Sequence, residues 1–378
     1  MRDILFLSHR LPYPPDRGDR IRSWHVLKAL AKIAPVHVCA LLDNEADRAH
    51  VPMVQSVAAS VTVACRRKFK LAAVIEALAT GRSASVLAFT DRTLMDAVHQ
   101  RLKTVDIVYA FSSQMAAYVP SSFAGRFVMD FVDMDSAKFA AMGFFARQEA
   151  KRLKAWEIAT AKRANISIFV SAAEAALFKR ETGLSARVME NGVDLAHFVP
   201  GVVPPVHAPY PLIVFTGQMD YAPNIGAVTE FVGNALPAIR AEFPAVRFAI
   251  VGRAPSAAVR ALAGPSVIVT GEVADTRPWL GAASVVVAPL QIARGVQNKL
   301  LEAMAMGKAC VASSGASRGL NIGDSRELIV ADDPAVAVVA LLRDPERRRA
   351  IGLAARERML ASFSWDKQLE PLAEFVGR

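Results

Sequence analysis

The chain has 378 residues, of which 53% are hydrophobic and 21% charged, and its formal net charge is +10 at pH 7. This length exceeds what one hydrophobic core usually supports, so two domains are expected. No apolar run approaches the roughly 18 residues of a spanning helix, and the opening MRDILFLSH is interrupted by Asp3 and lacks a leader cleavage site. The three cysteines are widely separated and have no metal-ligand spacing, which indicates a reducing, cytoplasmic compartment.

Short runs rich in β-branched and aromatic residues alternate with helix-length segments along the chain. The first half predicts strands at residues 4–8, 36–42, 61–65, 106–111, 126–132 and 166–171. A proline-rich linker is predicted at 199–211. The alternation then resumes, with strands predicted at residues 212–217, 247–252, 267–271, 284–290, 309–313 and 327–331 and a helix at 226–242. This rhythm is typical of parallel sheets covered on both faces, so two doubly wound α/β domains are expected.

The positive charge of the chain is most clearly concentrated in a basic cluster at residues 66–70. Arg66, Arg67, Lys68 and Lys70 directly precede an apolar helical stretch within residues 65–82. Such a segment can lie on an anionic bilayer surface. The alternative, a solvated basic turn before an ordinary core helix, is equally compatible with the residues.

A ligand site is expected at the loops that follow the strands of the second half, because open α/β sheets bind ligands outside the carboxyl ends of their strands. Three of these strands end in glycine, at Gly217, Gly252 and Gly271, which permits close approach of a ligand to the backbone. The dinucleotide fingerprint G-x-G-x-x-G is absent after the first strand of either half.

The segment ARGVQNKLLEAMAMGKACVAS brings Arg294, Lys299 and Glu302 together in the sequence. A helix that begins near Asn298 presents its free amides and positive dipole to the preceding loop, which favours an anion there. Lys299 in the first turn is unfavourable unless an anion is present. Arg294 can add bidentate phosphate contacts, Gly295 allows close approach, and Glu302 has the acceptor oxygens to hold a vicinal diol. The alternative is a surface pair of Lys299 and Glu302.

The same segment resembles the signature of the retaining glycosyltransferases of family 4, in which a glutamate inside E-A-M-A-x-G-x-x-V-V holds the ribose of a sugar nucleotide. SAAEAALFKRETGLSARVMENGVDLAHFVP resembles the family's interdomain stretch, and ERMLASFSWDKQLEPL resembles its helix that crosses back to the N-terminal domain. LPYPPDRGDRIRSWHVLKAL, DFVDMDSAKF and TGQMDYAPNIGA are further similar to the sugar transferases associated with exosortase and PEP-CTERM loci.

The resemblance implies a GT-B fold of two Rossmann-like domains facing a central cleft. It implies an acceptor-side domain at 1–200, a nucleotide-sugar domain at 201–360 and a returning helix at 361–378. The implied reaction is retaining transfer of a sugar from a nucleoside diphosphate to a hydroxyl of a glycan or lipid-linked acceptor, in exopolysaccharide or cell-surface glycan synthesis. The enzyme is then expected in the cytoplasm or on the inner face of the membrane, without cofactor, metal or nucleic-acid partner.

The resemblance also assigns residues. Glu302 matches the second glutamate of the family's E-x7-E motif, whereas Arg294 stands at the first. The family's phosphate-binding Arg and Lys correspond to Gln218 and Asn224, both neutral, so Arg294 and Lys299 are expected to supply the charge toward the diphosphate. The other expected donor-binding residues are Gly18, Gly217, Gly252, Glu272, Val273, Gly295, Gln297 and Asn298.

On the acceptor side, the chain offers Asp133 and Asp135 where the family often has a pocket histidine. Asp133 can accept from a hydroxyl of the sugar or of the acceptor, and its alternative role is the N-cap of a helix. Arg20 and Arg22 can attract an acceptor phosphate, although solvent exposure on a basic helix is slightly favoured for each. Two other functions stay open. One is a nucleotide-sugar epimerase or phosphorylase of the same fold; the other is a non-catalytic sugar-nucleotide-binding protein, for which the missing first glutamate is the best argument.

Overall fold

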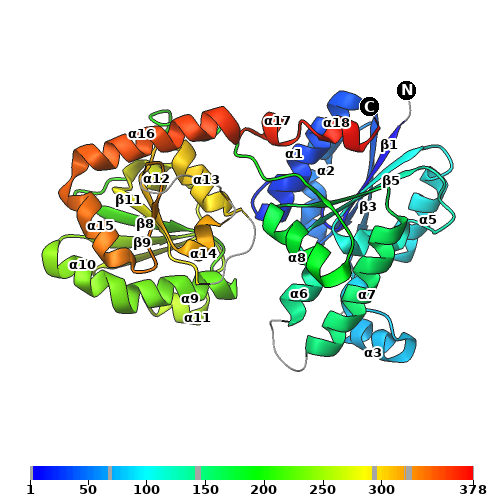
Figure 1. Cartoon of the computed structure of the whole chain (residues 1–378), viewed down its shortest axis with the longest axis horizontal. Coiled ribbons are helices and arrows are strands. Elements are labelled where there is room, and N and C mark those ends of the chain that lie inside the picture. Colours follow the sequence, from blue (N-terminus) through cyan, green and yellow to red (C-terminus); the bar gives the residue numbers. More distant parts are fainter. Residues whose placement is uncertain are drawn as a thin grey trace. The chain divides into compact units, whose positions relative to one another are not determined.

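The computed structural model describes residues 3–66, 70–140, 146–291, 296–318, 320 and 326–377. The chain divides into two compact units (Figure 1). The first unit comprises Met1–Glu190 and Leu369–Arg378, and the second comprises Asn191–Gln368. Each unit is built on its own parallel sheet, so the expected pair of doubly wound α/β domains is confirmed.

Within its described residues, the first unit has a seven-stranded sheet in the order β3-β2-β1-β4-β5-β6-β7. The strands are Ile4–Ser8 (β1), Val36–Leu42 (β2), Ser60–Cys65 (β3), Ile107–Phe111 (β4), Arg126–Val132 (β5), Ile166–Phe169 (β6) and Arg187–Val188 (β7). Every residue of β1 and β4 is buried, as expected for central strands covered on both faces. The two-residue β7 was not predicted because it is too short to show a pattern.

The helices of the first unit connect and cover these strands. They are α1 (Gly18–Ile33), α2 (Val51–Gln55), α3 (Lys70–Thr80), α4 (Ala84–Leu87), α5 (Arg92–Arg101), α6 (Asp135–Ala140), α7 (Arg147–Arg163), α8 (Ala172–Thr182) and α18 (Leu372–Phe375). The C-terminal residues return to this unit through Arg126, whose Nε donates to the carbonyl of Phe375 at 2.7 Å.

The second unit has, in its described part, a six-stranded parallel sheet in the order β10-β9-β8-β11-β12-β13. Its strands are Leu212–Thr216 (β8), Arg247–Val251 (β9), Val267–Gly271 (β10), Val285–Ala288 (β11), Cys310–Ala312 (β12) and Ile329–Val330 (β13). The chain runs outward from β8 to β9 and β10, and then crosses to β11 on the other side of β8. The strand order therefore reverses between β8 and β11, which is where doubly wound sheets bind their ligands.

Helices lie on both faces of this second sheet, with α9 and α10 on one side and α13 and α16 on the other (Figure 1). The helices are α9 (Ala222–Glu230), α10 (Leu236–Glu242), α11 (Ala257–Arg260), α12 (Arg277–Ala282), α13 (Asn298–Ala305), α14 (Ser314–Ser317), α15 (Pro334–Arg343), α16 (Pro345–Ser362) and α17 (Trp365–Gln368). The helix expected at 226–242 is α9 and α10, joined by a π-helical segment at Phe231–Ala235. The α13 helix begins at Asn298 as predicted, and its apolar residues are buried against the sheet.

Candidate functional site

The candidate site lies at the carboxyl ends of β8 and β9 and at the first turn of α13. Gly217 and Gly252 follow these two strands and have φ values of 156° and 152°, which L side chains rarely adopt. A Cβ on Gly252 would lie 1.7 Å from the carbonyl oxygen of Gly217. A Cβ on Gly217 would lie 3.0 Å from Nζ of Lys299 and 2.9 Å from Nδ2 of Asn224. Both positions therefore require glycine, and the two loops touch through their backbones.

Lys299 reaches from α13 to the loop that follows β8. Its Nζ donates to Oδ1 of Asn224 at 2.7 Å and lies 3.9 Å from the centroid of the Phe215 ring. Nδ2 of Asn224 donates in turn to the carbonyl of Gln218 at 2.8 Å. Because Asn224 stands in the first turn of α9, the ammonium of Lys299 is held between the starts of two helices.

Lys299 and Glu302 are both half-buried, and their ionisation is perturbed. Burial lowers the pKa of Lys299 to about 7, against the opposing effect of Glu302. Burial likewise raises the pKa of Glu302 to about 7, against the opposing effect of Lys299. Their ammonium and carboxylate do not come within ion-pair distance, since Lys299 turns toward Asn224, so the alternative of a surface ion pair is wrong. Two desolvated charged groups that do not form an ion pair with each other are typical of a ligand site.

The start of α13 contains two further predicted residues. Gln297 occupies the N-cap position without a side-chain cap hydrogen bond. Asn298 accepts from Nδ2 of Asn191 at 3.2 Å through its Oδ1. These residues place the free amides of the first turn beside Lys299. Arg294 and Gly295, predicted to complete this site, lie outside the described residues.

Arg253 belongs to the same group and was missed by the sequence reasoning. Its Nη2 donates to Oε1 of Gln218 at 3.4 Å. It directly follows Gly252, so the signal that could have revealed it is an arginine at the glycine-ended strand β9. By contrast, the predicted Glu272 and Val273 follow β10, the edge strand, two positions from β8 in the sheet. Glu272 is exposed, and Val273 packs against the core.

In the first unit, the predicted Asp133 follows β5 and accepts from Nζ of Lys138 at 2.8 Å. Burial alone would lower the pKa of Lys138, but Asp133 and Asp135 outweigh it and raise that pKa. Asp133 does not cap α6, so that alternative is wrong. The amides of Met134 and Ser136 at the start of α6 donate instead to Glu174 and Glu157 at 2.8 and 3.0 Å. The predicted Gly18 is the exposed first residue of α1.

The expected solvent exposure of Arg20 and Arg22 is wrong. Arg22 is fully buried, and its Nη2 lies 3.0 Å from Oδ2 of Asp130, which also accepts from the hydroxyl of Tyr109 at 2.7 Å. Arg20 is buried too and donates to Oδ1 of Asp47 at 3.0 Å. The partner of Arg22 is 108 positions away in the chain, so no local pattern reveals it. A buried arginine needs such a partner because an unpaired charge is costly to desolvate.

Of the basic cluster at 66–70, the structure describes the side chain of Arg66 alone. Its Nη2 lies 3.4 Å from Oδ1 of Asp43, and its guanidinium lies 4.9 Å from the centroid of the Phe89 ring. These contacts of Arg66 therefore lie within the first unit. Residues 67–69 and the side chain of Lys70 lie outside the described part of the chain.

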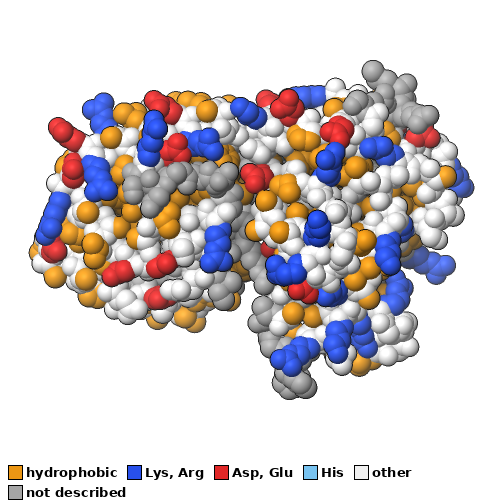
Figure 2. All heavy atoms as spheres, in the orientation of Figure 1, with side chains coloured by type: hydrophobic (Ala, Val, Ile, Leu, Met, Phe, Trp, Pro, Cys, Tyr) orange, Lys and Arg blue, Asp and Glu red, His pale blue; other side chains and the backbone are white. Residues whose placement is uncertain are grey.

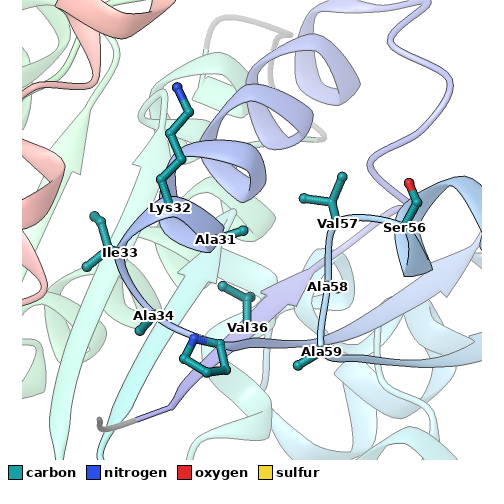
Figure 3. A pocket seen from close by; sticks show the side chains of 10 residues that line it. Ala31, Lys32, Ile33, Ala34, Val36, Ser56, Val57, Ala58 and Ala59 are labelled. Carbon is teal, nitrogen blue, oxygen red and sulfur yellow. The ribbon is translucent and has the colours of Figure 1, made fainter.

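A surface hollow of the first unit is lined by residues 31–36 and 56–59 (Figure 3). These residues lie at the amino ends of β2 and β3, and most have small apolar side chains. The hollow is thus at the opposite edge of the sheet from the carboxyl ends where a ligand is expected. Among the described residues, no group of three or more His, Cys, Asp or Glu side chains is placed to hold a metal ion. No helix in the described ranges is long and apolar enough to span a membrane.

Residues 210–344 match the family of glycosyl transferases, group 1. Two curated relatives are phosphatidyl-myo-inositol mannosyltransferases. The one from Propionibacterium freudenreichii is 27% identical over 215 residues, which are 54% of this chain and 53% of the relative. The one from Mycolicibacterium smegmatis is 32% identical over 191 residues, which are 47% of this chain and 48% of the relative. The chain thus spans about half the length of the curated relatives it matches.

Solved structures match almost the whole chain. Sucrose-phosphate synthase from Thermosynechococcus elongatus has a TM-score of 0.74 at 18% identity, covering 99% of this chain and 98% of that one. Anabaena HepE in complex with UDP-glucose has a TM-score of 0.73 at 17% identity, covering 99% of both chains. WaaG, a glycosyltransferase involved in lipopolysaccharide biosynthesis, has a TM-score of 0.69 at 14% identity, covering 99% and 100%. These likenesses confirm the expected GT-B fold.

Proposed function

We propose, from the premise that residues 210–344 form a glycosyl transferases group 1 domain, that this protein is a retaining glycosyltransferase. It transfers a sugar from a nucleoside diphosphate to an acceptor hydroxyl. The observation that carries the proposal is the placement of Lys299 of α13 beside Gly217, at the point where the strand order reverses. HepE, which shares the fold, was solved with UDP-glucose, and this supports a nucleotide-sugar donor here.

The proposed donor contacts follow from the charges at α13. The ammonium of Lys299 and the free amides of the first turn face an anion, which is the diphosphate. Glu302 stands one turn further along the helix, and its two carboxylate oxygens can accept from the two hydroxyls of a ribose. Arg294 is proposed to add a second cation, and Gly217 and Gly252 leave space for the ligand beside the backbone.

The proposed chemical step forms a bond between the acceptor oxygen and the anomeric carbon as the bond from that carbon to the diphosphate oxygen breaks. The acceptor proton passes to an oxygen of the leaving diphosphate, on the same face of the sugar, which gives retention. Negative charge grows on the diphosphate during this step, and Lys299 is proposed to stabilise it. No metal is needed in this scheme because the cations take its electrostatic role.

Asp133 is proposed to bind a hydroxyl of the acceptor or of the transferred sugar. Its Oδ2 accepts from the ammonium of Lys138 at 2.8 Å, and a carboxylate has further lone pairs that can accept from a hydroxyl. Val132 immediately before it has a φ of 68°, a conformation that β-branched residues rarely adopt. Such backbone strain at the end of a strand concentrates at functional positions.

The exposed surface of helix α3 supports the proposal that the acceptor is lipid-linked and that the protein binds peripherally to a membrane. Leu71, Val74, Ile75 and Leu78 recur at helical spacing and are 71%, 44%, 60% and 71% exposed. On the other face, Ala73 and Ala77 are buried against Leu87. In Figure 2, Lys and Arg side chains gather over the lobe that carries α3 and α7 in Figure 1. An exposed apolar face flanked by basic residues fits the surface of an anionic membrane.

We assign the reaction to exopolysaccharide or cell-surface glycan synthesis of the exosortase-associated type, on the cytoplasmic side of the membrane. A screen of UDP-, GDP- and ADP-sugars tests the function, with thermal shift for binding and release of the nucleoside diphosphate for turnover. A transferase releases the diphosphate, slowly with water and faster with an acceptor. An epimerase would leave the diphosphate attached or release free sugar isomer, a phosphorylase would need inorganic phosphate, and a non-catalytic protein would bind without turnover.

A further inference from the structure

Two neutral side chains that follow β8 each contact a cation from another element. Oδ1 of Asn224 accepts from Lys299 at 2.7 Å, and Oε1 of Gln218 accepts from Arg253 at 3.4 Å. We propose that Arg253 binds the diphosphate of the donor together with Lys299. The loop that follows β8 has no cationic side chain of its own, and the loop after β9 and helix α13 supply these two cations. This inference rests on the proposed nucleotide-sugar donor and adds a residue to its site.

The backbone around Arg253 is fixed by the neighbouring loop. The amide of Met219 donates to the carbonyl of Arg253 at 2.9 Å, and the amide of Ser256 donates to the carbonyl of Met219 at 3.1 Å. Met219 itself is fully buried. Ala254 has a φ of 52°, an uncommon conformation for a residue other than glycine. A strained position of this kind persists only where the surroundings hold it, so the start of the Arg253 side chain is well defined.

The glycines bring Arg253 and Lys299 to the same loop. A Cβ on Gly252 would lie 1.7 Å from the carbonyl of Gly217, and a Cβ on Gly217 would lie 3.0 Å from Nζ of Lys299. The guanidinium of Arg253 contacts Gln218 and the ammonium of Lys299 contacts Asn224, so both cations reach the loop that follows β8. An anion bound at this loop would be attracted by both.

A guanidinium has five donors in a planar fork that matches two phosphate oxygens at once, whereas an ammonium acts as a point charge. Arg253 therefore supplies the bidentate geometry, and Lys299 supplies the charge at the start of α13.

Arg253→Gln tests this assignment, with Arg240→Gln as the matched control. Arg240 lies at the end of α10, is exposed, and donates to the carbonyl of Pro244 at 3.2 Å. The probe is whichever of UDP, GDP and ADP gives the largest thermal shift with the unaltered protein, titrated calorimetrically at low and at physiological salt. Arg253→Gln should weaken binding by about 10- to 100-fold and flatten the salt dependence of Kd. Arg240→Gln should change neither.

The outcomes separate this inference from the function on which it rests. If the unaltered protein binds none of the three diphosphates, the proposed donor and the role of Arg253 are both overturned. If it binds one and Arg253→Gln binds it equally well, with the same salt dependence, the role of Arg253 alone is overturned. Arg253→Lys is the alternative test if Arg253→Gln fails to fold. This variant should keep the salt dependence of Kd and lose part of the affinity for the diphosphate. Loss of that salt dependence, although the positive charge is retained, would contradict the assignment.

Discussion

Nζ of Lys299 lies 2.7 Å from Oδ1 of Asn224, although the two residues are 75 positions apart in the chain. The first turns of α13 and α9 therefore meet at one point beside Gly217, and the cation at this point comes from α13. We therefore expect an ammonium carried by α9 at this point to serve the proposed site as well as one carried by α13.

An exchange of these two residues tests that statement. Lys299→Asn should weaken binding of the nucleoside diphosphate by about 10- to 100-fold, because a charge-assisted contact to phosphate is lost. Adding Asn224→Lys to that variant should restore about tenfold or more of the affinity, as measured by calorimetry. If the double variant folds and binds as weakly as Lys299→Asn, the cation at this point does not contact the ligand.

The proposed ribose contact of Glu302 predicts a preference for ribonucleotides over 2′-deoxyribonucleotides. Glu302→Ala should weaken binding of the diphosphate by about 1 to 3 kcal/mol, because ribose hydroxyls lose their acceptor in a desolvated site. The same variant should lose less affinity for the 2′-deoxy form, which keeps only the 3′-hydroxyl for Glu302 to accept from. Competition titrations with the two nucleotides measure the preference. An equal loss of affinity for both forms would place Glu302 away from the 2′-hydroxyl.

Lys299 should lower the stability of the unliganded protein. Its pKa falls from an ordinary 10.5 to about 7 on folding, so between these values the unfolded chain binds more protons and stability rises with pH. Lys299→Met removes this cost. A gain of about 1 kcal/mol corresponds to about 2 to 4 °C in Tm for a unit of this size.

The gain in Tm from Lys299→Met should be largest at and below about pH 7 and should shrink as pH rises toward 10.5, because the unfolded chain then loses the proton that it binds more tightly than the folded protein. Glu302 acts in the opposite direction, because its pKa rises from 4.5 to about 7 on folding, so the cost of its carboxylate grows with pH between these values and is constant above them. Differential scanning fluorimetry above about pH 7 therefore isolates the effect of Lys299. A lower Tm for Lys299→Met at about pH 7 would show that the lysine stabilises the fold.

The exposed apolar face of α3 predicts association with anionic membranes. Leu71→Ser with Leu78→Ser should reduce co-sedimentation with liposomes that contain anionic lipid, because the buried apolar area is lost. Leu353→Ser with Leu360→Ser is the matched control, since these residues of α16 are also seven positions apart and are 55% and 53% exposed. Equal sedimentation of both double variants and the unaltered protein would leave α3 without a membrane role. The donor hydrolysis of both variants should be unchanged, since neither touches the site at α13.

The sequence was most informative where the pattern is local. Apolar periodicity placed the strands, and the start of α13 at Asn298 followed from the polar residues before an apolar run. The contacts that build the site are between distant parts of the chain. Lys299 with Asn224 and Arg253 with Gln218 are separated by 75 and 35 positions, and periodicity does not encode such pairs.

Arg22 shows the same limit in the first unit. A basic helix at this position suggested solvent exposure, whereas the arginine is buried against Asp130 on β5. Whether a charged residue lies inside depends on a partner that another element supplies. Burial of Lys299 and Glu302, which shifts both of their pKa values, was likewise invisible before the sheet and helices were assembled.

The central claim is a catalytic nucleotide-sugar site at α13, and release of the nucleoside diphosphate measures it most directly. UDP-, GDP- and ADP-sugars are each incubated with the protein in EDTA, and the freed diphosphate is quantified with the unaltered protein and with Glu302→Ala. We predict release from at least one donor in EDTA, since cations take the place of a metal, and a decrease of about tenfold or more in the variant. Absence of release from all three donors, with and without added magnesium, or equal release by the variant, would contradict the account.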